Sequence, residues 1–203
     1  MGRTSDARQR LMDAAHELIW EYSYGAVTID AICERAGVKK GSFYHFFDSK
    51  SDLAVTAINA WWDERKVVID EIFRPEVAPL DRLRGYLDFI SRRQVAAYEA
   101  SGQVLGCPLF TLGAEIATQD EKIRLLICSL LDCLMACVER AIADGQASGE
   151  IEGRDAKAKA HVFLAYYEGV LTRARIENNP APFHRLSIDA LEVIGARPAL
   201  SPA

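Results

Sequence analysis

Residues 28–50, TIDAICERAGVKKGSFYHFFDSK, constrain the fold of this chain more than any other stretch. Apolar residues recur there at helical spacing, and Thr28 precedes them as a good N-cap. Gly37 permits the left-handed backbone at which helices commonly end. Two lysines, a serine, a tyrosine and a histidine follow within seven residues, with phenylalanines interleaved. The pattern predicts two short helices joined by a tight turn, of which the second carries groups suited to contacting DNA.

A helix–turn–helix unit places the first residues of its second helix against base edges in the major groove. The sequence therefore predicts a sequence-specific DNA-binding domain over residues 1–50. The other three-quarters of the chain, residues 51–203, needs a different role.

Helical periodicity also dominates outside this motif, and no segment has the alternation of a strand. Gly102, Gly106 and Pro108 interrupt it, so we expect residues 102–113 to be a loop with about one helical turn. The fold class predicted is all-α, with about nine helices. Beyond the pair within residues 28–50, helices are expected at about 7–24, 49–73, 80–100, 119–147, 155–177 and 183–195.

Composition narrows the class of protein. The formal net charge is −5, from 24 basic and 29 acidic residues, and a mildly acidic total is compatible with DNA binding because phosphate contacts depend on local charge. The N-terminus is polar and no apolar run reaches 18 residues, so we expect a cytoplasmic protein with no membrane partner. Five cysteines without CxxC spacing and four scattered histidines predict no disulfide framework, no metal site and no cofactor.

Residues 7–54 resemble the DNA-binding domain of the tetracycline-repressor (TetR) family of bacterial regulators. The resemblance implies a homodimer that binds a double-stranded DNA operator and dimerises through its last two long helices. It also implies a C-terminal domain that binds a small-molecule effector, whose binding moves the fourth helix and pulls the two reading helices out of register with the operator. The matching residues are Thr28, Ala36-Gly37-Val38, Gly41, Phe43-Tyr44, Phe47, Lys50 and Leu53.

Seven polar residues are predicted DNA contacts. Lys39 and Lys40 begin the reading helix, although they could instead be a solvated charge pair. Tyr44 could belong to the core, but Phe43 and Phe47 already supply two core anchors. The family resemblance implies a phosphate contact for the lysine that opens the fourth helix. The predicted contacts are Thr28, Lys39, Lys40, Ser42, Tyr44, His45 and Lys50.

Aromatic and cysteine side chains on the later helices are candidates to line an effector pocket, with ordinary core packing as the alternative for each. The candidates are Trp61, Trp62, Tyr86, Phe89, Cys107, Phe110, Cys133, Tyr166 and Tyr167.

Cys107 admits two further interpretations. Gly106-Cys107-Pro108-Leu109 and Leu112-Gly113-Ala114-Glu115 resemble a segment of one subgroup of TetR regulators, which respond to small unsaturated acids or reactive electrophiles. A loop cysteine near a helix start can be reactive, so one alternative is a regulator that senses redox change or electrophiles through Cys107. The other is a helical thiol enzyme, but no histidine lies near Cys107 in the sequence and we predict no catalytic residues. The favoured hypothesis is a ligand-responsive repressor that is not an enzyme.

Overall fold

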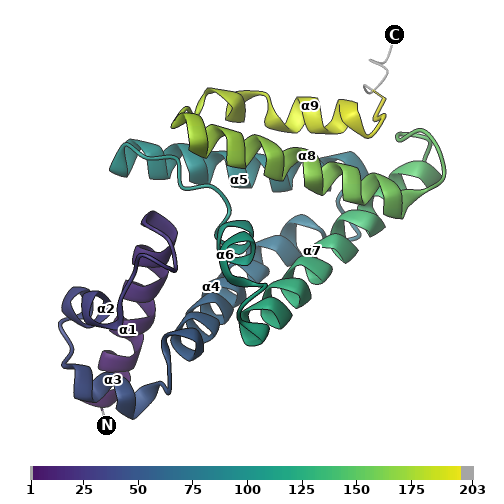
Figure 1. Ribbon diagram of the computed structural model, residues 1–203. Helices are drawn as coiled ribbons and strands as arrows, with labels where there is room; N and C mark the ends of the chain where they lie inside the picture. The colour runs from purple at the N-terminus through teal and green to yellow at the C-terminus, as the bar shows by residue number, and fades with distance from the viewer. Residues whose placement is uncertain (1, 198–203) are drawn as a thin grey trace. The chain divides into compact units, whose positions relative to one another are not determined.

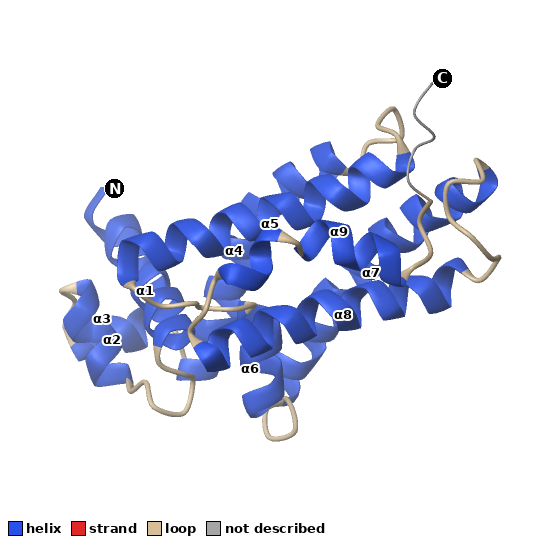
Figure 2. Ribbon diagram, turned by 90° about the horizontal axis from the view of Figure 1, so that it is seen from above, coloured by secondary structure: helices blue, strands red, loops and turns tan. Residues whose placement is uncertain are grey.

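The computed structural model describes residues 2–197, and this part of the chain is built from helices (Figures 1 and 2). Its only β-type pairing is an isolated bridge between Ile151 and Ala196. The prediction of an all-α fold with about nine helices is confirmed. The α-helices are α1 (Gly2–Glu21), α2 (Ile29–Ala36), α3 (Lys40–Phe46), α4 (Lys50–Ile72), α5 (Pro79–Ser101), α6 (Pro108–Ile116), α7 (Glu121–Ala147), α8 (Ala156–Glu177) and α9 (Leu186–Val193), and a 3-10 turn, η1, spans Ala181–His184.

The expected loop at residues 102–113 was wrong in its second half, because α6 begins at Pro108. Proline is well suited to the first position of a helix, where its missing N–H would be unpaired in any case. Gly113 does not break α6. A Cβ at Gly113 would lie 3.1 Å from Cγ2 of Ile127, so the glycine allows close packing against α7. Proline and glycine in this segment therefore mark a helix start and a packing position, and not a break.

The chain divides into two compact units. The first comprises the described residues up to Lys66 together with Pro108–Leu130, and the second comprises Val67–Cys107 together with the described residues from Leu131 onward. The chain passes from one unit to the other within α4 and within α7. The proposed domain boundary at residue 50 stays a prediction.

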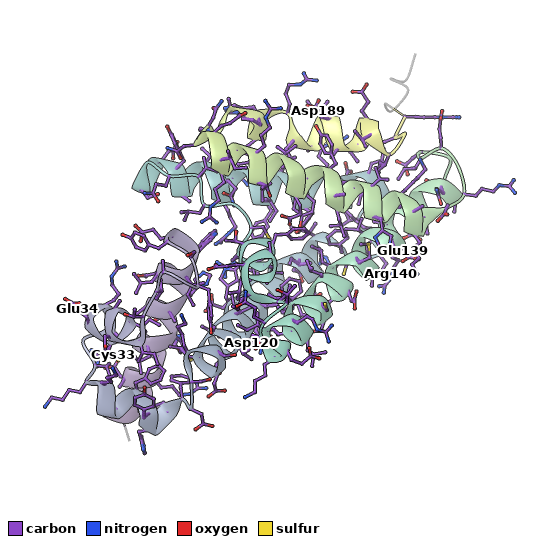
Figure 3. The ribbon with its side chains drawn as sticks, viewed as in Figure 1. Cys33, Glu34, Asp120, Glu139, Arg140 and Asp189 are labelled. Carbon is purple, nitrogen blue, oxygen red and sulfur yellow. The ribbon has the colours of Figure 1, made fainter. Side chains whose placement is uncertain are left out.

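In the first unit, α1 packs against α2, α3 and α6. The core includes Leu11 of α1, Ile32 of α2 and Phe43 of α3, each fully buried. Cys33 is buried on the inner side of α2, whereas its neighbour Glu34 is exposed (Figure 3). The amphipathic pattern of α2 therefore orients the helix as the sequence predicts.

In the second unit, α5 and α8 both pack against α9, and η1 contacts all three helices (Figure 1). The core here is mainly aliphatic and aromatic. Its fully buried side chains include Leu83, Leu87, Phe163, Leu171 and Ala190.

Arg82 is a buried cation in this unit, with 4% of the residue exposed. Its Nε donates to the carbonyl of Val77 at 2.7 Å and Nη2 to that of Pro75 at 2.7 Å. Nη1 donates to Oδ2 of Asp144 in α7 at 2.5 Å. Each nitrogen of the guanidinium therefore has an acceptor, and the side chain ties the α4–α5 connection to α7.

Candidate DNA-binding face and effector site

The turn between α2 and α3 has the capping geometry that the sequence predicts. Oγ1 of Thr28 accepts a hydrogen bond from the backbone N–H of Ala31 at 3.1 Å, so Thr28 is the N-cap of α2. Gly37 ends α2 in the left-handed conformation, with φ 61°, and its N–H reaches the carbonyls of Cys33 and Glu34. Two short helices joined by three residues result, as in a helix–turn–helix unit.

The short helix α3 places one aromatic ring inside and leaves its polar groups outside. Phe43 is fully buried, with its ring 5.9 Å from that of Phe47. Tyr44 is 54% exposed, and its ring meets the Phe43 ring edge-on at 5.1 Å. The remaining predicted contacts of this region are also exposed, namely Thr28, Lys39, Lys40, Ser42 and His45.

The predicted lysine contacts differ in their partners. Lys40 forms an exposed ion pair with Asp30 of α2, with Nζ 2.8 Å from Oδ1, and this hydrogen bond raises the lysine pKa. Lys50 is half-buried instead. Its Nζ donates to the carbonyls of Tyr24 and Val27 at 2.8 and 2.9 Å and lies 4.1 Å from the centre of the Tyr24 ring. Burial lowers the pKa of Lys50. Lys50 therefore supports the turn between α1 and α2.

A buried polar cluster lies in the second unit, where three predicted pocket residues come together. The hydroxyls of Tyr86 from α5 and Tyr167 from α8 are 3.2 Å apart, and their rings meet edge-on at 5.8 Å. Both tyrosines are almost fully buried, and burial raises the pKa of each. Cys107 is the third, since its thiol acts electrostatically on both phenols.

Glu168 of α8 is the fourth member of this cluster, and only 3% of the residue is exposed. Burial raises the pKa of its carboxyl from 4.5 to about 7. The Tyr167 hydroxyl and the Cys107 thiol act against this rise as hydrogen-bond donors. Neither contact has the geometry of a full hydrogen bond to the carboxylate oxygens. The carboxyl therefore retains hydrogen-bonding capacity in an environment that favours its protonated form.

The segment that carries Cys107 is fixed on both sides. The side-chain amide of Gln94, buried in α5, donates to the Gly106 carbonyl at 2.9 Å and accepts from the Gly106 N–H at 3.0 Å. Nη1 of Arg175 in α8 donates to the carbonyl of Leu105 at 2.9 Å. Oδ1 of Asn178, the C-cap of α8, accepts from the N–H of Val104 at 2.9 Å. These bonds hold Cys107 beside the two tyrosines and Glu168.

Other predicted pocket residues have different surroundings. Trp62 is buried and Trp61 half-buried in the first unit, where the guanidinium of Arg65 lies 4.3 Å from the Trp61 ring. Phe110 in the same unit is 37% exposed. In the second unit Phe89 and Cys133 are half-buried, as is Tyr166, whose pKa is raised by burial and by the carboxylate of Asp189 on α9.

Glu168 is not among the residues predicted from the sequence, although the sequence contains a signal for it. Leu164 and Leu171 belong to the apolar stripe of α8, and Glu168 lies four residues after the first and three before the second. This spacing puts a carboxylate on the buried face of the helix. A charged residue in an apolar stripe is either paired or functional, so the position could have been singled out.

Within residues 2–197, every helix is too short or too polar to span a lipid bilayer. Over the same part of the chain, no three histidine, cysteine or acidic side chains are grouped closely enough to hold a metal ion.

Comparison with known proteins agrees with this architecture. Residues 11–57 match the sequence model described as bacterial regulatory proteins of the tetR family. Residues 79–188 match the model of the tetracyclin repressor-like C-terminal domain. The first match includes α2, α3 and the start of α4, and the second includes the buried cluster.

Individual relatives extend over most of the chain. The transcriptional regulator AcuR of Cereibacter sphaeroides is 31% identical over 88% of this chain and 80% of its own length. The HTH-type transcriptional repressor DhaR of a Mycobacterium species is 24% identical over 96% of this chain and 94% of its own. The crystal structure of a regulatory protein TetR from Rhodobacter sphaeroides superposes with a TM-score of 0.78 at 30% identity, covering 91% and 96% of the two chains. The chain therefore belongs to the TetR family of bacterial regulators and is a ligand-responsive, DNA-binding transcriptional regulator.

Proposed function

We propose that this regulator is a repressor that releases a roughly palindromic operator when a small molecule binds the cluster of Glu168, Tyr86, Tyr167 and Cys107. One observation supports this effector site: Glu168 is buried, and its carboxyl oxygens lack hydrogen bonds of full geometry. Operator DNA lies in the bacterial cytoplasm, so we place the regulator there. We also propose that it acts by binding alone and catalyses no reaction.

For DNA contact we propose the exposed side chains at the start and middle of the helix–turn–helix unit. Lys40 and Tyr44 are four residues apart on α3 and so share one face of the helix. Their ammonium and phenol groups suit phosphate oxygens, while Ser42 and His45 offer hydrogen bonds to base edges. The hydroxyl of Thr28 and the N-terminal amides of α2 suit a further phosphate. Lys50 contributes to DNA binding in part by supporting the turn between α1 and α2.

A dimer is needed to present two reading helices about 34 Å apart to successive major grooves. We propose that α8 and α9 form its interface. Val162 and Ile176 of α8 and Ile188 and Val193 of α9 are large apolar side chains between 46% and 79% exposed. A Cβ at Gly169 of α8 would meet nothing within 4 Å, so this position is open to a close helix from the second copy. Ile176→Glu should lower the sedimentation coefficient to that of a monomer.

The test of operator binding is selection of duplexes from a random-sequence library. We expect the selected sites to be palindromic and the affinity to fall steeply with salt. Lys39→Ala should weaken binding to every selected site. It should also reduce the slope of log affinity against log salt concentration by about one, because one phosphate contact is lost. Lys122→Ala is the matched control, since Lys122 is an exposed lysine of α7. Failure to select any duplex would refute the proposal.

The effector site is tested by a thermal-shift screen of small acids, aldehydes and aromatic compounds. A true effector should raise the melting temperature and also release the selected duplex. Glu168→Gln should remove both effects while leaving DNA affinity unchanged. A compound that releases DNA equally well from Glu168→Gln would place the effector site elsewhere.

A second candidate is an electrophile-sensing regulator, and the proximity of Cys107 to Glu168 favours it. The Glu168 carboxylate has a pKa suited to accepting the thiol proton. The thiolate would then add to an activated C=C bond of the signal molecule. The C–S bond forms as the π bond breaks, and Glu168 returns the proton to the carbanion that results. Cys107→Ser should abolish this response and preserve operator binding. An unchanged response would leave reversible effector binding as the mechanism.

A further inference from the structure

The carboxylate of Glu115, in α6, holds the turn between α1 and α2 by accepting hydrogen bonds from backbone amides of that turn. Oε2 accepts a hydrogen bond from the N–H of Tyr24 at 2.9 Å, and Oε1 accepts one from the N–H of Gly25 at 2.6 Å. These residues are about 90 positions apart in the sequence but belong to the same compact unit. Hydrogen bonds from backbone amides to a carboxylate are stronger than neutral ones and fix direction as well as distance.

The same turn is held on its carbonyl side from α4. Lys50 donates to the carbonyls of Tyr24 and Val27, and Val27 directly precedes Thr28, the N-cap of α2. Glu115 also acts electrostatically on Lys50. The turn that sets where α2 begins is therefore held by an anion from α6 and a cation from α4.

Gly25 leaves room for the anionic half of this arrangement. A Cβ at residue 25 would lie 2.9 Å from Oε1 of Glu115, closer than carbon and oxygen atoms normally approach. A side chain here would push the carboxylate away from the turn. The contact is thus built from two positions, Glu115 and Gly25, and each can be altered separately.

The helix that presents Glu115 begins one residue after Cys107, a member of the proposed effector site. Glu115 is seven residues beyond Pro108, so a single rigid segment of about 10 Å separates the two ends. Displacement of Cys107 by an effector would move α6 as a body, because a helix of nine residues transmits movement along its axis. The movement would reach the two hydrogen bonds at the turn.

We propose that Glu115 is a positioning residue that couples the effector site to the DNA-reading helices. This role rests on the proposed function. With Glu115 bonded to the turn, α2 and α3 keep the geometry that the operator selects. When α6 shifts, the bonds break and that geometry is no longer favoured. Because coupling between two sites is reciprocal, operator DNA must in turn favour one state of the Cys107 segment.

The experiment uses this reciprocity, so it needs no identified effector. The full-length protein is treated with iodoacetamide, and the alkylation rate of Cys107 is followed by peptide mass spectrometry with and without a saturating concentration of a selected duplex. In the wild type we expect the duplex to change the Cys107 rate by about fivefold or more, within the usual range of allosteric coupling. In Glu115→Gln and in Gly25→Ala the change should fall below about twofold.

Glu121→Gln is the matched control, because Glu121 is an exposed glutamate of α7 that pairs with Arg124. It should behave as the wild type does. The rate at exposed Cys128 serves as an internal reference in every sample. A melting curve for each variant distinguishes lost coupling from lost fold, and if Glu115→Gln does not fold, Gly25→Ala carries the comparison.

Two results would overturn the role of Glu115. One is a duplex-dependent change in Glu115→Gln and Gly25→Ala as large as in the wild type. The other is a wild type that binds the duplex with no change at Cys107, which would leave operator binding intact and remove the coupling through α6. A protein that selects no duplex at all would instead refute the proposed function, and the role of Glu115 with it.

Discussion

Arg82 and Glu168 are both buried ionisable residues of the second unit, yet their surroundings differ completely. The guanidinium of Arg82 donates to two carbonyls and to Asp144, with donor–acceptor distances from 2.5 to 2.7 Å. The carboxyl of Glu168 has two phenols and a thiol nearby but no hydrogen bond of full geometry to either oxygen. Both are at least 96% buried, since 4% and 3% of the two residues are exposed.

The contrast indicates different roles. Transferring an ion out of water is costly, and partners as complete as those of Arg82 offset that cost. Such a group is part of the scaffold. Glu168 lacks this compensation, so it lowers the stability of the ligand-free protein when it is ionised, and a ligand that supplies the missing bonds would recover that stability. Incomplete satisfaction of a buried group is therefore the physical basis for assigning the effector site to this cluster.

Removing Arg82 should have the largest effect. Arg82→Met keeps much of the volume but leaves the carbonyls of Val77 and Pro75 without their donor and Asp144 without its counter-ion. The Asp144 side chain is 46% exposed and can be solvated, so the expected loss is that of the hydrogen bonds from the charged guanidinium, each about 1.5–3 kcal/mol in the free energy of unfolding. Urea denaturation at fixed protein concentration measures this. Arg84→Met is the control, because Arg84 is exposed and forms an exposed ion pair with neighbouring Asp81, so its loss should cost less than about 0.5 kcal/mol. Equal losses for the two arginines would remove the contrast.

Glu168→Gln should act in the opposite direction and depend on pH. Burial raises the pKa of this carboxyl from 4.5 to about 7, so between these values the folded protein holds a proton that the unfolded chain has lost. The stability contributed by the raised pKa is complete below about pH 4.5 and is lost as pH rises through about 7. Glutamine does not titrate, so the stability of the variant relative to wild type should rise by about 3 kcal/mol between pH 4.5 and pH 8.

The measurement is a set of urea unfolding curves for both proteins across that pH range. Any constant offset between the two reports the amide's own hydrogen bonding and does not affect the conclusion. A difference that stays constant with pH would mean that Glu168 is solvated or paired in solution, and the assignment of the effector site would lose its basis.

How far the sequence predicts the molecule depends on the range of the interactions involved. Thr28 and Gly37 act on backbone groups within a few residues, so the helix boundaries they set were predicted correctly. The helix α6 was missed because local signals at Pro108 and Gly113 have two meanings, and packing against Ile127 of α7 selects the helical one.

The candidate site shows the same dependence on range. Tyr86, Cys107 and Tyr167 were chosen from the sequence for their chemistry, and only the fold brings α5, the segment before α6 and α8 together around them. The bonds of Glu115 to the α1–α2 turn could not be predicted, because no local pattern links positions 90 residues apart. Glu168 was predictable in principle, because its place in the apolar stripe of α8 is a local feature.

The smallest expected effect concerns Tyr86 and Tyr167. Their hydrogen bonding is less complete than that of Arg82 and more complete than that of Glu168. Tyr86→Phe keeps the ring contacts with Phe73 and Tyr167 and removes only the hydroxyl that lies 3.2 Å from the Tyr167 hydroxyl. The Tyr167 hydroxyl is then free to donate to Glu168, which has acceptor capacity to spare. The cost in unfolding free energy should therefore be about 1 kcal/mol or less. In a Glu168→Gln background this rescue is weaker, so the same Tyr86→Phe change should cost more. If its cost is the same in both backgrounds, Tyr167 does not turn to Glu168, and the two groups do not form one network.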